Sequence, residues 1–122
     1  MTIQECYFAL GGSYEQVARR LPSAGMVERF LARFPGDDSF AKLCAGMECG
    51  RREEAFRAAH TLKGVCANLG LDRLMDSAGR LTELLRPEQD AIPEGADALL
   101  REVRQDYEIT VAAIETYLNS RS

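Results

Sequence analysis

Apolar residues recur every three or four positions along most of the chain, and no stretch of useful length alternates between apolar and polar residues. The first pattern is typical of helices with one buried face, whereas half-buried strands require alternation. The sequence therefore predicts an all-α protein. Turn and capping residues divide it into predicted helices at residues 3–10, 14–21, 26–34, 39–49, 51–69, 73–86 and 94–119.

Glycine, proline and short polar residues mark the ends of these helices. Gly70 is a natural left-handed helix end, Ser13 and Asp72 are natural helix starts, and Pro93 suits a first turn. The longest helices have short connections between them, which favour antiparallel neighbours. We therefore expect an up-and-down antiparallel four-helix bundle with additional short N-terminal helices, forming a single domain over residues 1–122.

The composition excludes several classes of protein. With 122 residues, of which 46% are hydrophobic and 28% charged, the chain is long enough to bury a core of its own. A net charge of −4 argues against a nucleic-acid binder, which needs a basic excess. No segment approaches the roughly 20 apolar residues that span a bilayer, and the N-terminus lacks the basic region of a secretion signal. We expect a cytoplasmic protein without membrane contact.

The four cysteines give no sign of a metal site. A cytoplasmic chain is expected to keep Cys6, Cys44, Cys49 and Cys66 as reduced thiols. Cys44 and Cys49 are too far apart in sequence to match the paired spacing of a zinc site completed by His60. We therefore predict no bound metal.

His60 is the only histidine in the sequence. When the helix at 51–69 is drawn with about 100° per residue, His60 lies almost opposite the apolar stripe. That stripe consists of Ala58, Leu62, Val65 and Leu69, with Ala55 and Cys66 at its edge. The imidazole is therefore expected to face solvent. A neutral imidazole is a good nucleophile near pH 7.

An isolated surface histidine is usually idle, but its neighbours here are unusual. Gly64 follows one turn later, although glycine inside a helix costs roughly 1 kcal/mol relative to alanine. On a solvent face it leaves a flat spot that another protein's backbone could approach, and Ala67 extends that face. Lys63 lies within reach of a phosphoryl group on the imidazole, and Arg57 adds positive charge on the other flank.

The stretch at residues 59–64 reads AHTLKG and is followed by NLG at 68–70. It resembles the signature of histidine phosphotransfer (HPt) domains. The resemblance is specific across about residues 55–71, and elsewhere the layout of helices and turns agrees with the family plan. It implies a phosphocarrier of two-component phosphorelays.

The resemblance also implies roles for individual residues. His60 is expected to accept a phosphoryl group, at Nε2, and to exchange it with the aspartates of receiver domains. Lys63 is expected to contact that group. The receiver is expected to approach over Gly64, Ala67 and Arg57.

Two further features follow from the family pattern. Many members carry Gln or Glu on the next helix to orient the imidazole; by spacing Thr82 takes this position, with a shorter reach, and Asn68 is a second candidate. Apolar residues near the histidine usually form a docking patch, for which Met26 and Phe30 are the candidates. Packing in the core is the alternative explanation for both apolar residues.

The implied partners are a response-regulator receiver domain and a hybrid sensor kinase. We expect a monomer without a cofactor of its own, with Mg²⁺ held by the receiver. The sequence has no Walker-type phosphate loop, so we expect a carrier rather than an enzyme. Two alternatives remain open: an HPt-like adaptor that binds a receiver or kinase without transfer, and the phosphoacceptor domain of a larger sensor kinase.

Overall fold

The computed structural model describes residues 1–121, and every regular element within them is a helix. The predicted all-α fold is confirmed. The bundle consists of α4 Ser39–Glu48, α5 Arg52–Leu69, α6 Asp72–Leu85 and α7 Ala96–Ser120. The elements that precede it are α1 Ile3–Leu10, α2 Tyr14–Arg20, α3 Ala24–Arg33 and the 3-10 turn η1 Phe34–Gly36.

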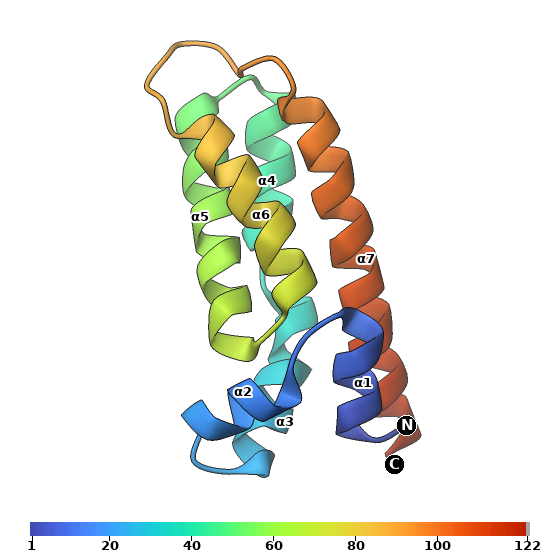
Figure 1. Ribbon diagram of the computed structural model, residues 1–122. Helices are drawn as coiled ribbons and strands as arrows, with labels where there is room; N and C mark the ends of the chain where they lie inside the picture. Colours follow the sequence, from blue (N-terminus) through green and yellow to red (C-terminus); the bar gives the residue numbers. More distant parts are fainter. Residues whose placement is uncertain (122) are drawn as a thin grey trace.

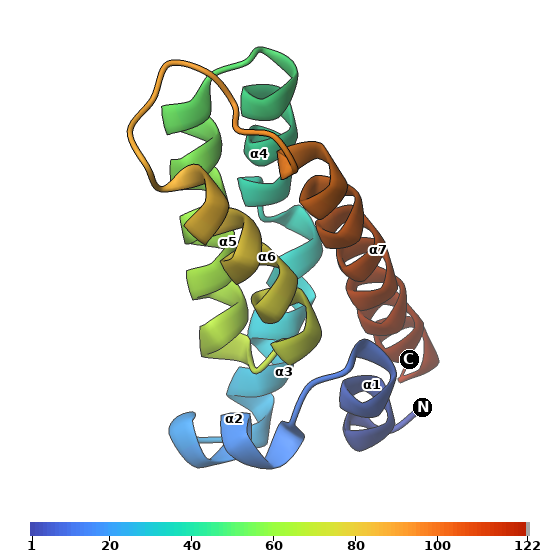
Figure 2. The same ribbon diagram turned by 45° about the horizontal axis from the view of Figure 1, so that its top comes forward.

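The four bundle helices run alternately up and down (Figure 1). Tight corners join α4 to α5 and α5 to α6, and the longer segment 86–95 joins α6 to α7. α1 packs against the C-terminal half of α7, and α2 and α3 lie at the same end of the molecule (Figure 2). The N-terminal amine of Met1 donates a hydrogen bond to Ser120 Oγ at 3.2 Å. The predicted bundle with added N-terminal helices is confirmed.

The predicted helix ends lie within two residues of the observed ones. Ser13 accepts a hydrogen bond from the first turn of α2, and Gly70 ends α5 with a left-handed φ of 68°. Two predictions are wrong. Asp72 is the first residue inside α6 and makes no capping bond, and Pro93 lies in the preceding connection. α7 starts after Gly95, whose left-handed φ of 90° turns the chain into the helix.

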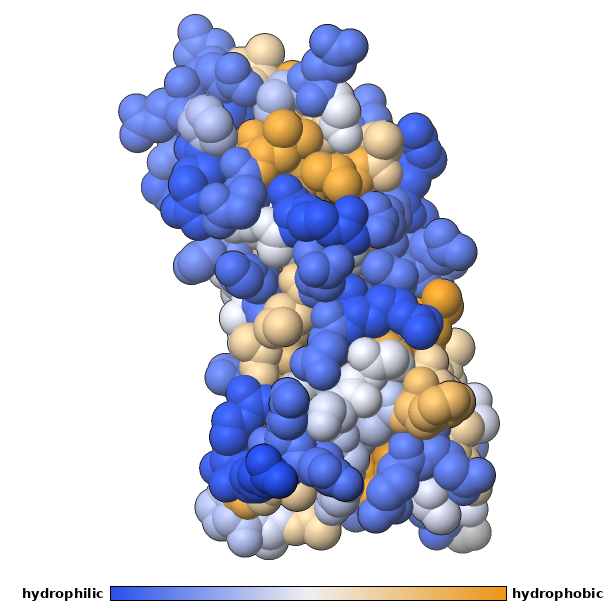
Figure 3. All heavy atoms as spheres, in the orientation of Figure 1, coloured by the Kyte–Doolittle hydropathy of each residue, from blue (hydrophilic) through white to orange (hydrophobic). Residues whose placement is uncertain are grey.

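All four bundle helices contribute to one core, which includes fully buried leucines of α4, α5 and α6 and Ile114 of α7. Cys6 and Cys66 also lie inside it. Burial raises the pKa of Cys6 to about 11 and raises the pKa of Cys66 further. The surface over α6 is mostly hydrophilic, with an apolar patch where the end of α6 meets the start of α7 (Figure 3).

The N-terminal segment is fixed to the end of α5. Tyr7 donates a hydrogen bond from its hydroxyl to the carbonyl oxygen of Leu69 at 2.6 Å. Gly12 approaches Gly70 so closely that a Cβ atom at residue 12 would collide with the Gly70 carbonyl oxygen. This end of α5 is therefore held by contacts from outside the four-helix bundle.

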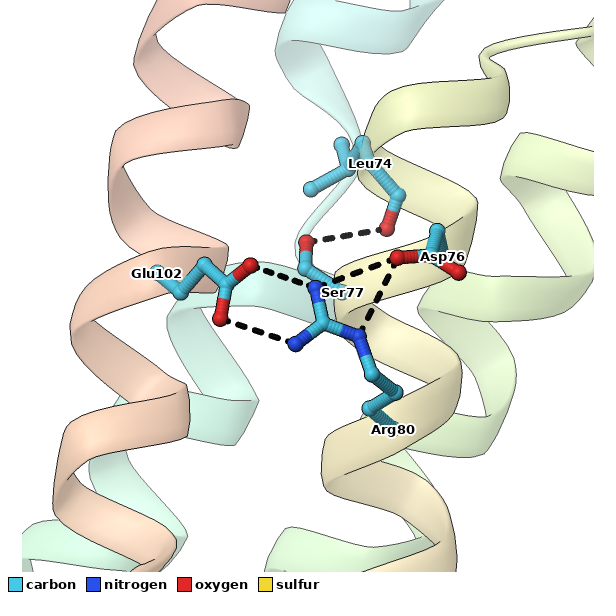
Figure 4. Close-up of polar contacts among 5 residues, drawn as sticks. All are labelled: Leu74, Asp76, Ser77, Arg80 and Glu102. Carbon is cyan, nitrogen blue, oxygen red and sulfur yellow. Dashed lines mark hydrogen bonds and ion pairs between the residues drawn. The ribbon is translucent and has the colours of Figure 1, made fainter.

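Arg80 connects α6 to α7 on the surface (Figure 4). Its guanidinium binds both carboxylate oxygens of Glu102 on α7, and it also pairs with Asp76 one turn earlier on α6 at 3.1 Å. The Arg80 hydrogen bonds lower the pKa of Glu102. Because these groups are exposed to solvent, the pairs add little to stability.

Arg52 is a buried cation that fixes the connection between α6 and α7. It donates hydrogen bonds to the carbonyl oxygens of Leu85 at 2.6 Å and Gln89 at 2.9 Å, and only 9% of its surface is exposed. The Leu85 carbonyl belongs to the last turn of α6, where the helix dipole favours a positive charge.

Replacing Arg52 by methionine is therefore expected to lower the free energy of unfolding by about 1 to 2 kcal/mol, because it leaves these acceptors without a donor. Urea denaturation measures the loss. The neighbouring Arg51 is 65% exposed, so Arg51→Met should change stability by less than about 0.5 kcal/mol. Equal losses in the two variants would contradict the role given to Arg52.

Candidate functional site

His60 lies midway along α5 and is exposed, whereas its neighbours Ala59 and Leu62 are buried. The other buried residues of α5 beyond its first turn are Ala55, Ala58, Cys66 and Leu69. The helical spacing predicts this orientation. The imidazole therefore faces solvent from a helix whose opposite side is fixed in the core.

Phe56, one turn before His60, lies beside the imidazole. The ring centroids are 6.1 Å apart and the ring planes differ by 20°. Phe56 is half-buried and packs against the core. The guanidinium carbon of Arg86, at the end of α6, lies 5.2 Å from the centre of the Phe56 ring. The imidazole thus has an aromatic neighbour that is in contact with both the core and α6.

The surface one turn after His60 is bare. Gly64 is exposed, and a Cβ atom there would meet nothing within 4 Å. Gly46 on α4 provides a contrast, because a Cβ there would meet the Ala55 backbone at 2.8 Å. Packing thus explains the glycine at residue 46 but not the one at residue 64. Ala67, half-buried one further turn along, also has a small side chain, so it extends the surface that large side chains leave open.

The cations on the two flanks of His60 differ in their partners. Arg57 pairs with Glu53 at 2.6 Å, which offsets its charge. Lys63 is half-buried and lies over Gly79 of α6, where a Cβ would be 3.5 Å from its Cε. Within residues 1–121 Lys63 forms no ion pair shorter than 4 Å. Lys63 is therefore the flanking cation that is ready to bind an added anion.

Glu83 on α6 supplies a carboxylate to the same surface. Two hydrogen bonds from Arg86, of 3.0 and 3.1 Å, lower the pKa of Glu83, and the nearby charges of Lys63 and His60 act in the same direction. The imidazole therefore lies among an aromatic ring, a bare glycine, a cation and a carboxylate, on adjacent helices.

The Hpt domain family model matches residues 25–115, from the start of α3 into α7. The chain belongs to the Hpt domain family. Hpt domains are phosphocarriers of two-component phosphorelays, in which they interact with receiver domains and kinases. The resemblance seen in the sequence is thus confirmed. Comparisons with curated proteins and with solved structures gave no match.

Within the described part of this Hpt domain, residues 1–121, no helix has the length and apolar character needed to cross a membrane. No group of three or more His, Cys, Asp or Glu side chains converges there to hold a metal ion.

The prediction that Thr82 orients the imidazole is wrong. Thr82 is fully buried, and its hydroxyl donates a hydrogen bond to the Ala78 carbonyl oxygen at 2.7 Å. The next residue, Glu83, is turned by about 100° around the helix and is exposed, and the charge of His60 contributes to lowering its pKa. Asn68 is exposed and lines a groove further along α5.

This groove lies between α3 and α5 and has a volume of about 240 Å³. Its lining residues are Phe30, Arg33, Phe34, Asp37, Val65, Asn68 and Leu69. Phe30 is half-buried, so it packs against the core and also presents an edge to the groove. Met26 is half-buried as well but does not line it. The structure thus places Phe30, more than Met26, on a surface continuous with α5.

Sequence analysis missed Phe56, Glu83 and Arg86. Phe56 could have been found, because residues four apart on a helix are neighbours. Glu83 and Arg86 reach the site from α6, and their position depends on how α6 is rotated against α5.

Proposed function

We propose that His60 is the residue of this Hpt domain that carries the phosphoryl group, and that it exchanges the group with the aspartate of a receiver domain. The observation that carries the proposal is the exposed imidazole on α5, with open space beside Gly64 and the cation of Lys63 on its flank. A carrier needs an accessible and well-placed nucleophile, because phosphoryl transfer depends chiefly on positioning and electrostatics.

The exchange is balanced without any further reactant. A lone pair on one ring nitrogen of His60, expected to be Nε2, attacks the phosphorus of the aspartyl phosphate. The P–N bond forms, the P–O bond to the aspartate breaks, and its electron pair remains on the released carboxylate. The proton on the other ring nitrogen stays in place. The reverse reaction returns the group to a receiver.

Lys63 is suited to contact the new phosphoryl group, since among residues 1–121 its amine forms no ion pair within 4 Å that it would have to break first. We expect the receiver to hold the Mg²⁺ ion that assists transfer. We also expect it to approach over Gly64 and Ala67 beside Arg57, with the edge of Phe30 as part of the docking surface.

Incubation with phosphorylated receiver domains and Mg²⁺ tests the proposal. We expect label on this chain that is lost in acid and kept in alkali, as for a phosphorylated histidine, and mass spectrometry should place it on His60. Label on another residue, or an acid-stable label, would contradict the proposal. Binding of a receiver without any label would favour the non-transferring adaptor.

A further inference from the structure

Positive charge is concentrated at the end of the molecule formed by α2 and α3. Residues 14–33 hold four arginines and two glutamates, a net charge of +2. Because the whole chain has a net charge of −4, the other residues together carry −6. All four arginines are exposed, and together they form what we call the basic surface: Arg19, Arg20, Arg29 and Arg33. An otherwise acidic protein therefore has one basic end.

The charges of the basic surface are not offset by carboxylates of this chain. Within residues 1–121, none of the four arginines forms an ion pair within 4 Å. Glu28 on α3 is already occupied, since it pairs with Arg121 at 2.7 Å and accepts a hydrogen bond from Tyr117 at 2.9 Å. Exposed side chains without such partners contribute little to folding. Stability therefore does not explain why these arginines lie together.

On α3, the basic surface adjoins the side of α5 that carries the imidazole. Arg33 lines the groove between α3 and α5 together with Asn68, an exposed residue two turns after His60. The guanidinium carbon of Arg33 lies 5.9 Å from the centre of the Phe30 ring at the same groove. Arg29 lies one turn earlier on the same side of α3. Two of the four charges thus border the α5 surface.

α2 extends the basic surface beneath the C-terminal end of α5 (Figures 1 and 2). The two elements are in contact, because a Cβ atom on Gly70 would be 3.3 Å from the Cβ atom of Val17. Arg19 and Arg20 form the last turn of α2, and the surface over α2, at the lower left of Figure 3, is strongly hydrophilic. Both arginines precede the residues that match the Hpt family model.

A receiver that docks on His60 is large enough to reach the basic surface. A standard interface covers about 800 Å² of each partner, which corresponds to a disc with a radius of about 16 Å. Leu69 lines the same groove as Arg33, and it lies about 14 Å from His60 along the helix axis. The basic surface is therefore at the rim of such an interface, where charges act on the association rate and its salt dependence.

We propose that the basic surface attracts the acidic face of a receiver domain and accelerates its docking on His60. The inference rests on the proposed function of His60. A receiver binds Mg²⁺ through carboxylates beside its phosphoacceptor aspartate, and the phosphoryl group adds further negative charge. Complementary charges of this kind raise association rates by about 10- to 1,000-fold. The arginines act before the chemical step and do not contact the phosphoryl group.

The test measures association by stopped-flow fluorescence with a dye-labelled receiver domain. The receiver that labels the wild-type protein fastest is used or, if none gives label, the one that binds it most tightly. The double variant Arg29→Gln/Arg33→Gln should associate about fivefold more slowly than the wild type at low ionic strength. At about 0.5 M salt the difference should fall below twofold, because salt screens exposed charges over a few ångströms.

Arg101→Gln/Arg104→Gln is the matched control. It also removes two exposed arginines one turn apart, from α7 on the other side of the bundle from α5 (Figure 1). One member of this pair also lies over an aromatic ring, with Arg104 at 5.4 Å from the ring centre of Phe40. Because both double variants change the net charge equally, the control separates a local effect from a general one. It should alter association by less than about 1.5-fold.

Equal slowing in the two double variants, or no slowing in either, would overturn the proposal. So would an equal loss of labelling by phosphoramidate, a small phosphoryl donor that releases ammonia on transfer and needs no docking surface. Unchanged receiver association together with lost binding to phosphatidylserine vesicles would assign the basic surface to membranes instead. Receiver association without any label on the wild type would contradict the proposed function, and the association rates would still decide the role of the basic surface. If no receiver associates with the wild type, both proposals fail.

Discussion

Replacement of His60 by glutamine is expected to abolish phosphoryl acceptance while the protein stays folded. Glutamine retains a polar side chain of similar length but offers no nucleophilic nitrogen, because the amide lone pair is delocalised. His60 is exposed and its ring stacks with that of Phe56. The free energy of unfolding should therefore change by less than about 0.5 kcal/mol. Labelling with a phosphorylated receiver measures the loss, and thermal unfolding verifies the fold.

The same variant separates carrier from adaptor. If His60→Gln still binds a receiver with affinity close to that of the wild type, then docking and chemistry are distinct functions of one surface. A variant that retains labelling would show that another residue accepts the group. In that case the exposed imidazole would not be the reason for the bare surface around Gly64.

Helix faces could be predicted from the sequence because they depend on local periodicity. The apolar residues of α5 repeat at helical spacing, which fixes the outward direction of His60 without reference to any other helix. Gly64 and Lys63 follow by the same rule, since residues three and four apart share a face. The positions of His60, Lys63 and Gly64 could therefore be predicted from the periodicity of α5 alone.

The contribution of α6 could not be predicted in the same way. A shift of one residue turns a side chain by about 100°, and this separates buried Thr82 from exposed Glu83. The rotation of α6 is set by packing against α5 and α7, including the contact of Lys63 with Gly79. Arg52 was missed for a related reason, because its hydrogen-bond partners lie far along the chain.

Replacing Gly64 by glutamine is expected to slow transfer from a phosphorylated receiver by about thirtyfold, equivalent to about 2 kcal/mol. The new side chain projects into open space beside His60, where it meets no part of its own chain but blocks a docked partner. Helix formation should improve slightly, because glutamine exceeds glycine in helix propensity by roughly 0.5 to 1 kcal/mol. The loss would therefore not come from unfolding.

Two comparisons isolate the steric cause. Gly64→Ala brings a similar gain in helix propensity with only one added methyl group, so it should slow receiver transfer by less than about threefold, a cost below 1 kcal/mol. Phosphoramidate is small enough to reach His60 without a docking surface, so it should label Gly64→Gln at close to the wild-type rate. If the two donors were slowed equally, the glutamine would be disturbing the imidazole itself, and the bare surface beside His60 would not be the place where the receiver approaches.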